Sequence, residues 1–415
     1  MLRPLAFPAA LAALALAAPA SAQTFTTLQQ DSQAQITDIA SVGMGGAVAA
    51  VPTLDSPFFS NPAHMAGTER LSINVLGFTA GVGGNVRETY TFYEDMLGPA
   101  IEEGLDEIRT NDPDRLEALY DEAFRVGSSQ KTADVAVLAP SVRMRFGQIA
   151  VGAGVYGTGT ARAKISNGGA GIPYLDAYSQ ADVLVPLVVA TDVPGLPFGL
   201  QAGASMTYVQ RRISAKGEAV DALDPDSEKL YVFRGDGVRF GLGLDAHDVG
   251  TPGLDLGLAV TNVGSALDVE IDDSFPIEGS EDAPDDAAEI ARLDARFAGR
   301  ESASAVRAGA AYRIPVPAVP GFPISDVAVA ADYTSASTSE FDQSFQAGLR
   351  GGVRATLARV LELRTGLSQG MVSAGISLKS RFARLDYATY GVEDGRLLGQ
   401  QNRRNHVVQV RFGLF

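Results

Sequence analysis

The feature that most constrains this chain is an alternation, with period two, of apolar residues with small or polar ones, which recurs from residue 71 to the end. In residues 254–260, leucine and valine alternate with aspartate, glycine and alanine. Residues 238–245 and 306–313 follow the same rule, with arginine or aspartate among the small residues. Such alternation predicts β-strands with two unlike faces. A face rich in glycine and alanine suits the crowded interior of a barrel whose apolar face meets lipid, whereas a soluble sandwich would expose Lys, Glu and Thr.

The alternating segments number about fourteen, an even count as in bacterial outer-membrane barrels with both ends in the periplasm. They are 71–81, 134–146, 148–163, 180–191, 198–213, 230–246, 254–269, 304–314, 325–336, 343–357, 360–367, 371–379, 382–390 and 405–415. Short or proline-stiffened turns alternate with long loops such as 82–133 and 270–303. The sequence therefore predicts an all-β fold, a transmembrane antiparallel β-barrel that occupies residues 69–415.

The N-terminus has the pattern of a cleavable signal peptide over residues 1–22. Arg3 precedes an apolar run from Leu5 to Ala18, and small residues end the segment at Ala22. The chain has no cysteine, which excludes a lipoprotein anchor, disulfides and thiolate metal sites. We therefore expect an exported protein of the cell outer membrane, with outer-membrane lipid and the barrel-insertion machinery as partners.

The composition narrows the function classes further. The chain holds 33 basic and 49 acidic residues, for a net charge of −16, and we find no segregated basic patch. Such a chain repels nucleic acid, so no nucleic-acid partner is expected. Glycine is frequent at 45 residues and tryptophan is absent, which favours one large all-β unit over several α/β domains.

Two of the long loops have features of their own. Residues 89–127 carry apolar residues at helical spacing, and Asp112-Pro113 would start a second helix there. This predicts a helical insertion in an extracellular loop. Residues 268–303 are rich in acids but lack the spaced Asp/Asn-Gly pattern of a calcium loop, so a solvated acidic loop is expected.

Two motifs resemble enzyme sites. The glycines of residues 43–49 have the spacing of a dinucleotide loop, but no buried strand precedes them and Pro52 interrupts the helix that should follow. Residues 366–370 fit the G-x-S-x-G nucleophile elbow, yet the alternation continues after them, which favours a hairpin tip. The three histidines are isolated from one another in the sequence. We therefore expect no enzyme, no metal site and no cofactor.

The glycine stretch instead resembles a known segment. Gly43, Gly45 and Gly46 followed by Asn61-Pro62-Ala63 are similar to the N-terminal segment of the long-chain fatty-acid transporter (FadL-type) superfamily. Within it, the likeness is greatest to barrels labelled TraF-type (conjugal transfer) or PorV-type (secretion). The resemblance implies a barrel of about 14 strands and a hatch in its lumen, here residues 23–68. It also implies that Asn61-Pro62-Ala63 is the turn that anchors the hatch.

The predicted lumen is rich in charge, unlike a purely apolar conduit. The residues expected to face it are Arg143, Arg145, Arg239, Asp245, Arg307, Arg313, Arg350, Arg364 and Arg384. These could form salt-bridged ladders that fill the barrel. The chain ends in Phe415, the residue type of a membrane-insertion signal, although the apolar residues before it stand in the opposite register.

Two functions of different classes follow from these features. The first is uptake of a small hydrophobic ligand across the outer membrane, as the resemblance implies. The alternative is a non-transporting scaffold that binds a secretion or conjugation protein partner through its long loops. A soluble periplasmic β-protein fits the alternation less well, because its polar face would meet bulk water.

Overall fold

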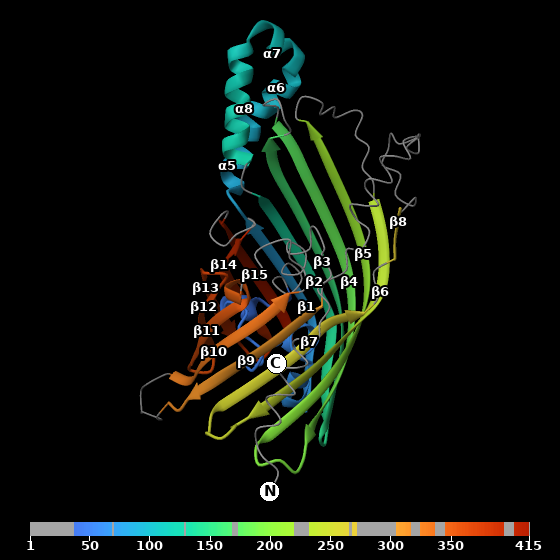
Figure 1. Cartoon of the computed structure of the whole chain (residues 1–415), viewed down its shortest axis with the longest axis vertical. Coiled ribbons are helices and arrows are strands. Elements are labelled where there is room, and N and C mark those ends of the chain that lie inside the picture. Colours follow the sequence, from blue (N-terminus) through green and yellow to red (C-terminus); the bar gives the residue numbers. More distant parts are fainter. Residues whose placement is uncertain are drawn as a thin grey trace.

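In a computed structural model, the chain forms a closed antiparallel β-barrel of 14 strands (Figure 1). The structure describes residues 37–68, 70–127, 130–167, 173–219, 232–264, 268–271, 304–316, 324–336, 345–393 and 402–414. The expected signal peptide, nearly all of the acidic loop 268–303, and Phe415 lie outside these ranges.

Each strand pairs with the next along the chain, and β15 pairs with β1 to close the ring. The strands are β1 (Leu71–Gly83), β2 (Lys131–Phe146), β3 (Ile149–Asn167), β4 (Pro173–Val193), β5 (Gly199–Ala219), β6 (Val232–His247), β7 (Leu254–Gly264), β8 (Asp268–Ile271), β9 (Ala305–Ile314), β10 (Ile324–Ala336), β11 (Leu349–Leu357), β12 (Leu361–Ser368), β13 (Met371–Lys379), β14 (Ala383–Glu393) and β15 (Asn402–Leu414). The short β8 pairs with β6 only, so it continues the position of β7 in the ring. The prediction of an all-β transmembrane barrel from alternation is confirmed.

Two of the predicted strand segments differ in detail. The segment 254–269 is interrupted, because Phe240 pairs with Val263 whereas Leu242 pairs with Val260. Two β7 residues therefore oppose one residue of β6, which is a β-bulge, and Asn262 adopts a positive φ of 58°. The segment 343–357 begins its strand only at residue 349, after the helical turn α10 (Phe345–Gly348). An apolar alternation this short does not distinguish the start of a strand from a single helical turn.

The outer surface of the barrel is an apolar band. Phe240 and Leu242 on β6 are 51% and 65% exposed, whereas the residues that alternate with them, Arg239 and Gly241, are buried. Phe412 on β15 is likewise exposed and alternates with buried Arg411. A closed barrel with an apolar outer face belongs in the bacterial outer membrane. Among the described residues, no helix has the length and apolar character needed to cross a membrane.

A helical insertion connects β1 to β2 and stands at one end of the barrel (Figure 1). Its elements are α5 (Val86–Phe92), the π-helical turn η2 (Tyr93–Leu97), α6 (Gly98–Glu103), α7 (Leu105–Asn111) and α8 (Pro113–Gly127). Ile108, Leu116 and Leu119 form its own apolar core. The opposite end of the barrel carries tight turns, such as the one at Gly147. By the usual orientation of such barrels, the helical end is extracellular.

Residues 37–67, which we call the inner segment, lie inside the ring (Figure 1, blue). The segment contains α3 (Ile39–Gly43), α4 (Ser56–Phe59) and the 3₁₀ helix η1 (Pro62–Gly67). Helix α3 contacts β12 to β15, whereas η1 contacts β3 to β6 on the other side of the barrel. The inner segment therefore bridges opposite walls, and its side chains are almost entirely buried.

Candidate functional site

The inner segment approaches the wall where the strands carry glycine. A Cβ added at Gly203 would lie 2.4 Å from the backbone of Pro62, and one added at Gly257 would lie 1.9 Å from the carbonyl oxygen of Ala49. These distances are far below van der Waals contact, so only glycine permits the approach. The glycine- and alanine-rich face noted in the sequence thus serves backbone-to-backbone packing between wall and inner segment.

Asn61 joins two turns of the inner segment to the wall. Its side-chain oxygen accepts a hydrogen bond from Ala63 N at 3.1 Å and so caps η1. Its amide nitrogen donates to Ala49 O at 2.9 Å and to Leu244 O on β6 at 3.1 Å. With Pro62 at the first helical position, this side chain fixes the start of η1 against β6.

Wall arginines hold the backbone of the inner segment from several sides. Arg143 donates to Leu54 O at 3.0 Å and Arg145 donates to Ala66 O at 2.5 Å, both from β2. From β15, Arg411 donates to Thr37 O at 2.8 Å and also pairs with the buried carboxylate of Asp55. Charge-assisted bonds of this kind are among the stronger hydrogen bonds in proteins.

The face of β12 to β14 that points into the barrel carries a ladder of ion pairs. Arg384 pairs with Asp386 at 2.7 Å, and Arg364 lies 3.7 Å from the same carboxylate. Arg364 also pairs with Glu362, which in turn accepts from Lys379. Three cations thus face two carboxylates here, so most of the charge on this side of the lumen is paired.

An apolar cluster occupies the other side. It joins Phe58 and Met65 of the inner segment to Leu138, Tyr156, Leu184 and Val209 of the wall. Phe59 packs edge-on against Tyr156, with ring centroids 4.9 Å apart. The apolar, aromatic cluster thus lies toward β2 to β5, a side that also carries the buried ion pair of Asp182 on β4 with Arg211 on β5.

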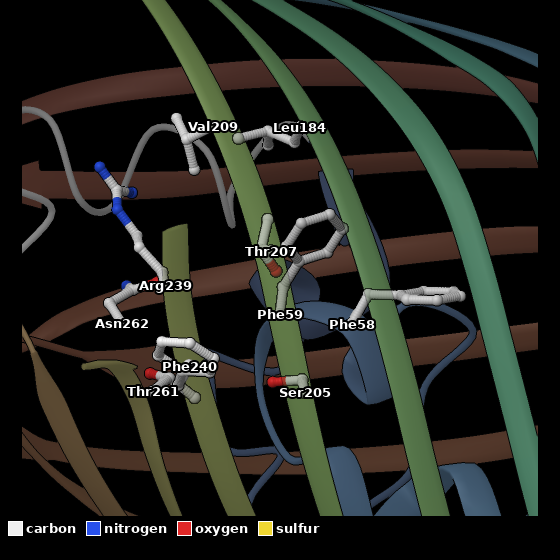
Figure 2. Close-up of a pocket in the computed structure, with 10 residues that line it drawn as sticks. All are labelled: Phe58, Phe59, Leu184, Ser205, Thr207, Val209, Arg239, Phe240, Thr261 and Asn262. Atoms are coloured by element: carbon white, nitrogen blue, oxygen red, sulfur yellow. The ribbon is translucent and has the colours of Figure 1, made fainter. Parts of the chain in front are cut away.

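A pocket of about 50 Å³ lies beside this apolar cluster (Figure 2). Phe58 and Phe59 reach it from α4, which lies behind β4 and β5 in this view, and Leu184 and Val209 line it from β4 and β5. Its polar groups come from Ser205, Thr207, Arg239, Thr261 and Asn262. Phe240, which is exposed on the outer surface, also lines it, because the β7 bulge at Asn262 interrupts the regular wall there. Five of the ten lining residues are therefore apolar and five are polar, so the pocket is mixed in character.

His64 is enclosed where η1 meets β6. Its Nε2 lies 3.1 Å from Ala49 O and 3.5 Å from a carboxylate oxygen of Asp245, and its Nδ1 lies 2.8 Å from Ser56 Oγ. Burial is the largest cause that lowers the pKa of His64 from 6.5 to about 3, with the positive charges of His247 and Arg307 adding to it. The imidazole is therefore neutral in the docked inner segment at ordinary pH.

This shift predicts that acid weakens docking through His64. Below pH 6.5 a released His64 takes up a proton that the docked one refuses, so the free energy of docking falls by about 1.4 kcal/mol per pH unit, or about 2 kcal/mol at pH 5. The His64→Gln variant should not show this loss. As pH falls, its inner segment should therefore become more stably docked relative to that of the wild type. Hydrogen–deuterium exchange of peptides covering 38–66, compared between pH 7 and pH 5, measures the difference.

Asp38, whose pKa is raised to about 6 mainly by burial, titrates in the opposite sense. Because it is present in both proteins, its contribution cancels in the comparison. Equal pH dependence of protection in the variant and the wild type would contradict the assignment of a neutral, docked His64.

The other residues expected at the lumen lie in several environments. Arg239 lines the pocket of Figure 2, and Asp245 contacts His64. Arg307 and Arg350 line a second cavity of about 50 Å³ that Gly45 and Gly46 border. Arg313 pairs with Asp255 at 3.0 Å near the end of β9, where its side chain is about half exposed. Gly43 lies where an added Cβ would meet Gly375 of β13.

The structure also places the two motifs that resembled enzyme sites. The glycine stretch forms α3 and the turn after it, and no strand precedes it among the described residues. Ser368 ends β12, and Gln369-Gly370 make the turn into β13, so the stretch is a hairpin tip. Asp386 is buried in the lumen, whereas His406 stacks on Tyr387 at the outer surface. Ser368, Asp386 and His406 therefore do not form one site.

Sequence reasoning did not single out the residues that line the pocket. Phe58 and Phe59 are adjacent aromatic residues just before the Asn61-Pro62 turn, which was the one signal available. The remaining lining residues come from β4 to β7, and only the closure of the ring brings those strands to α4.

Comparison with known proteins supports the fold. No family model and no curated protein matches the chain. A deltaS2 mutant of the TodX monoaromatic hydrocarbon channel has a TM-score of 0.50, with 14% identity over 90% of this chain and 98% of that one. The Ralstonia pickettii toluene transporter TbuX has a TM-score of 0.46 and 14% identity, covering 90% and 97%. The P. putida toluene transporter TodX has a TM-score of 0.45 and 12% identity, covering 90% and 96%.

At this identity the likeness concerns the fold alone. The TodX mutant shares the barrel over nearly its whole length, which agrees with the fold that the FadL-type resemblance implied. The TraF-type and PorV-type likeness finds no support among these structures.

Proposed function

We propose that this outer-membrane barrel takes up small hydrophobic compounds and that its N-terminal segment, residues 23–68, is a hatch. The observation that carries the proposal is the pocket of Figure 2, which lies between the inner segment and an interrupted part of the wall. The five apolar residues of its lining offer a small ligand burial worth about 25 cal/mol per Å² of apolar surface. The Asn61-Pro62-Ala63 turn, next in sequence to Phe58 and Phe59, would hold these rings in place.

The charged lumen is compatible with this function because many of its inward charges are held in ion pairs, including the buried pair of Asp182 with Arg211 on β4 and β5. The ladder of Arg364, Arg384 and their acidic partners lies on β12 to β14, away from the pocket. Of the nine lumen residues expected from the sequence, Arg239 is the one that lines the pocket. A hydrophobic compound in the pocket would meet five apolar side chains, three of them phenylalanine rings, together with five polar residues.

The scaffold alternative has no comparable observation to carry it. It requires a secretion or conjugation partner that binds the long loops, and loops 220–231 and 272–303 lie outside the described residues. We therefore propose uptake rather than scaffolding.

Photolabelling tests where a ligand sits. A small alkylbenzene that bears a diazirine would be added to intact cells, irradiated, and its adducts located by peptide mass spectrometry. We expect the label on the α4 peptide with Phe58 and Phe59 and on the β5 peptide with Thr207 and Val209, because these line one pocket. An excess of unlabelled toluene should reduce both adducts together. Label found only on outward residues such as Val183 and Leu187 would mean solution in lipid and would contradict the pocket.

A further inference from the structure

The pocket of Figure 2 has an apolar edge and a polar edge. Phe58 and Phe59 of α4 and Leu184 of β4 supply the apolar edge, whereas the polar lining residues all come from β5, β6 and β7. In Figure 2, Arg239 and Asn262 lie at one end of the labelled side chains and Phe58 lies at the other. A ligand that fills the pocket therefore contacts both kinds of surface.

Two directly opposite residues form the centre of the polar edge. Thr207 of β5 pairs with Arg239 of β6 in the antiparallel register, an arrangement that places two Cβ atoms about 5 Å apart. Arg239 is only 5% exposed, so its guanidinium is enclosed within the barrel. Two residues along β5, the hydroxyl oxygen of Ser205 would lie 2.5 Å from a Cβ added at Gly241. Glycine at this position therefore leaves space beside the Ser205 hydroxyl.

The polar edge offers hydrogen-bond donors. A guanidinium can only donate, and a threonine or serine hydroxyl can donate as well as accept. None of the ten described residues that line the pocket is acidic. Arg239 has an interaction partner of its own in the structure, so its charge does not call for a bound anion. A carboxylate would lose its hydration on entering such a site, whereas an uncharged oxygen acceptor loses much less.

A pure hydrocarbon fits the polar edge poorly. It would displace water from hydroxyl and guanidinium groups without accepting a hydrogen bond from them, which is unfavourable. Sites that hydrogen-bond a ligand discriminate strongly against an analogue that lacks the polar group. The phenylalanine rings, in contrast, favour an aromatic ring as neighbour.

We infer that the preferred ligand is a small aromatic compound that carries one uncharged oxygen acceptor, such as an aryl ketone. Its ring lies against Phe58 and Phe59, and its oxygen accepts hydrogen bonds from the Thr207 hydroxyl and the Arg239 guanidinium. This inference rests on the proposed function, because it concerns the ligand of the same pocket.

Competition against the alkylbenzene photolabel tests the preference, with the purified full-length barrel in lipid vesicles at neutral pH. The competitors are acetophenone, cumene and benzoate, which have the same number of heavy atoms but differ as ketone, hydrocarbon and carboxylate. The concentration of each that halves the adduct on the Phe58–Phe59 peptide is referred to the lipid phase, which removes the difference in hydrophobicity. Acetophenone should compete at a concentration at least about tenfold lower than cumene. Benzoate should compete less well than acetophenone.

Two variants assign the preference to the polar edge. Thr207→Val removes the hydroxyl with little change of shape, and Arg239→Met removes the guanidinium. Each should reduce the preference for acetophenone over cumene several-fold. Thr158→Val is the matched control, because Thr158 is a buried threonine of β3 that does not line the pocket. Heat-modified migration in gels checks folding, and if Arg239→Met does not fold, Thr207→Val alone decides.

The possible failures are distinguishable. Equal competition by acetophenone and cumene, or an unchanged preference in folded Thr207→Val, would overturn the ligand class while hydrocarbon uptake stands. Stronger competition by benzoate than by acetophenone would indicate a charged ligand and overturn the uncharged acceptor. Absence of any label on the Phe58–Phe59 peptide would contradict the proposed function itself, and the ligand class with it.

Discussion

Replacement of Gly45 by valine is expected to release the inner segment from the wall while the barrel stays closed. Gly45 has a φ of +66°, and a Cβ there would lie 2.7 Å from the backbone of Leu367 on β12. The positive φ costs on the order of 1 kcal/mol and overpacking against backbone adds about 1–3 kcal/mol. The ring itself is held by hydrogen bonds between strands all the way round, and these do not pass through Gly45.

Hydrogen–deuterium exchange of residues 38–66 measures this release, and heat-modified migration reports the barrel. Gly67→Val is the matched control, because an added Cβ at Gly67 meets no atom within 4 Å. Protection of the inner segment should fall by at least about tenfold in the Gly45 variant and stay close to wild type in the control. If the Gly45 variant keeps full protection, the close approach to Leu367 does not hold the segment.

Removal of the Asp55 carboxylate is expected to have the largest effect on stability. Asp55 is 3% exposed and pairs with Arg411, which is also 3% exposed. Asp55→Ala would leave a buried guanidinium without its counter-charge, which costs about 3–5 kcal/mol in the free energy of unfolding. Replacement of both partners, with Asp55→Leu and Arg411→Met, should recover most of that loss, since neither charge remains.

Urea unfolding of the barrel refolded in lipid vesicles gives these free energies. Asp192→Ala is the control, because the pair of Asp192 with Arg145 is about one-third exposed and should contribute about 1 kcal/mol or less. If Asp55→Ala lowers the free energy of unfolding no more than Asp192→Ala does, the buried guanidinium of Arg411 does not need the Asp55 carboxylate as its counter-charge. If the double variant is no more stable than Asp55→Ala, the loss of stability comes from the packing of α4 rather than from the unpaired charge.

The strands could be predicted from the sequence because their signal is local. Leu256, Leu258 and Val260 alternate with inward residues such as Asp255, and the burial pattern of β7 repeats that alternation. The same reasoning missed the bulge at Asn262, because the pairing register between β6 and β7 depends on two strands rather than one. It also extended β11 into α10, where the alternating run was too short to decide.

The candidate site was less predictable because it is assembled from distant parts of the chain. Alternation alone was sufficient to predict that Arg364 and Arg384 would face the lumen, but not that Glu362 and Asp386 would neutralise them. The FadL-type resemblance pointed to the region around Asn61. The sequence offered no means of placing Thr207 or Val209 beside Phe59, since the contact exists only once the inner segment lies inside the closed ring.

The most direct test of the account is the initial rate of toluene uptake by intact cells at low concentration. The comparison is between cells that lack this protein and the same cells supplied with wild type, Val209→Trp or Val183→Trp. Val209 is fully buried at the pocket, whereas Val183 on the neighbouring strand is 42% exposed to lipid, so the second variant is a matched control. We predict faster uptake with wild type and with the Val183 variant, and a several-fold lower rate when tryptophan fills the pocket. Equal rates in cells with and without the wild-type protein, each with an intact outer membrane, would contradict uptake through this barrel.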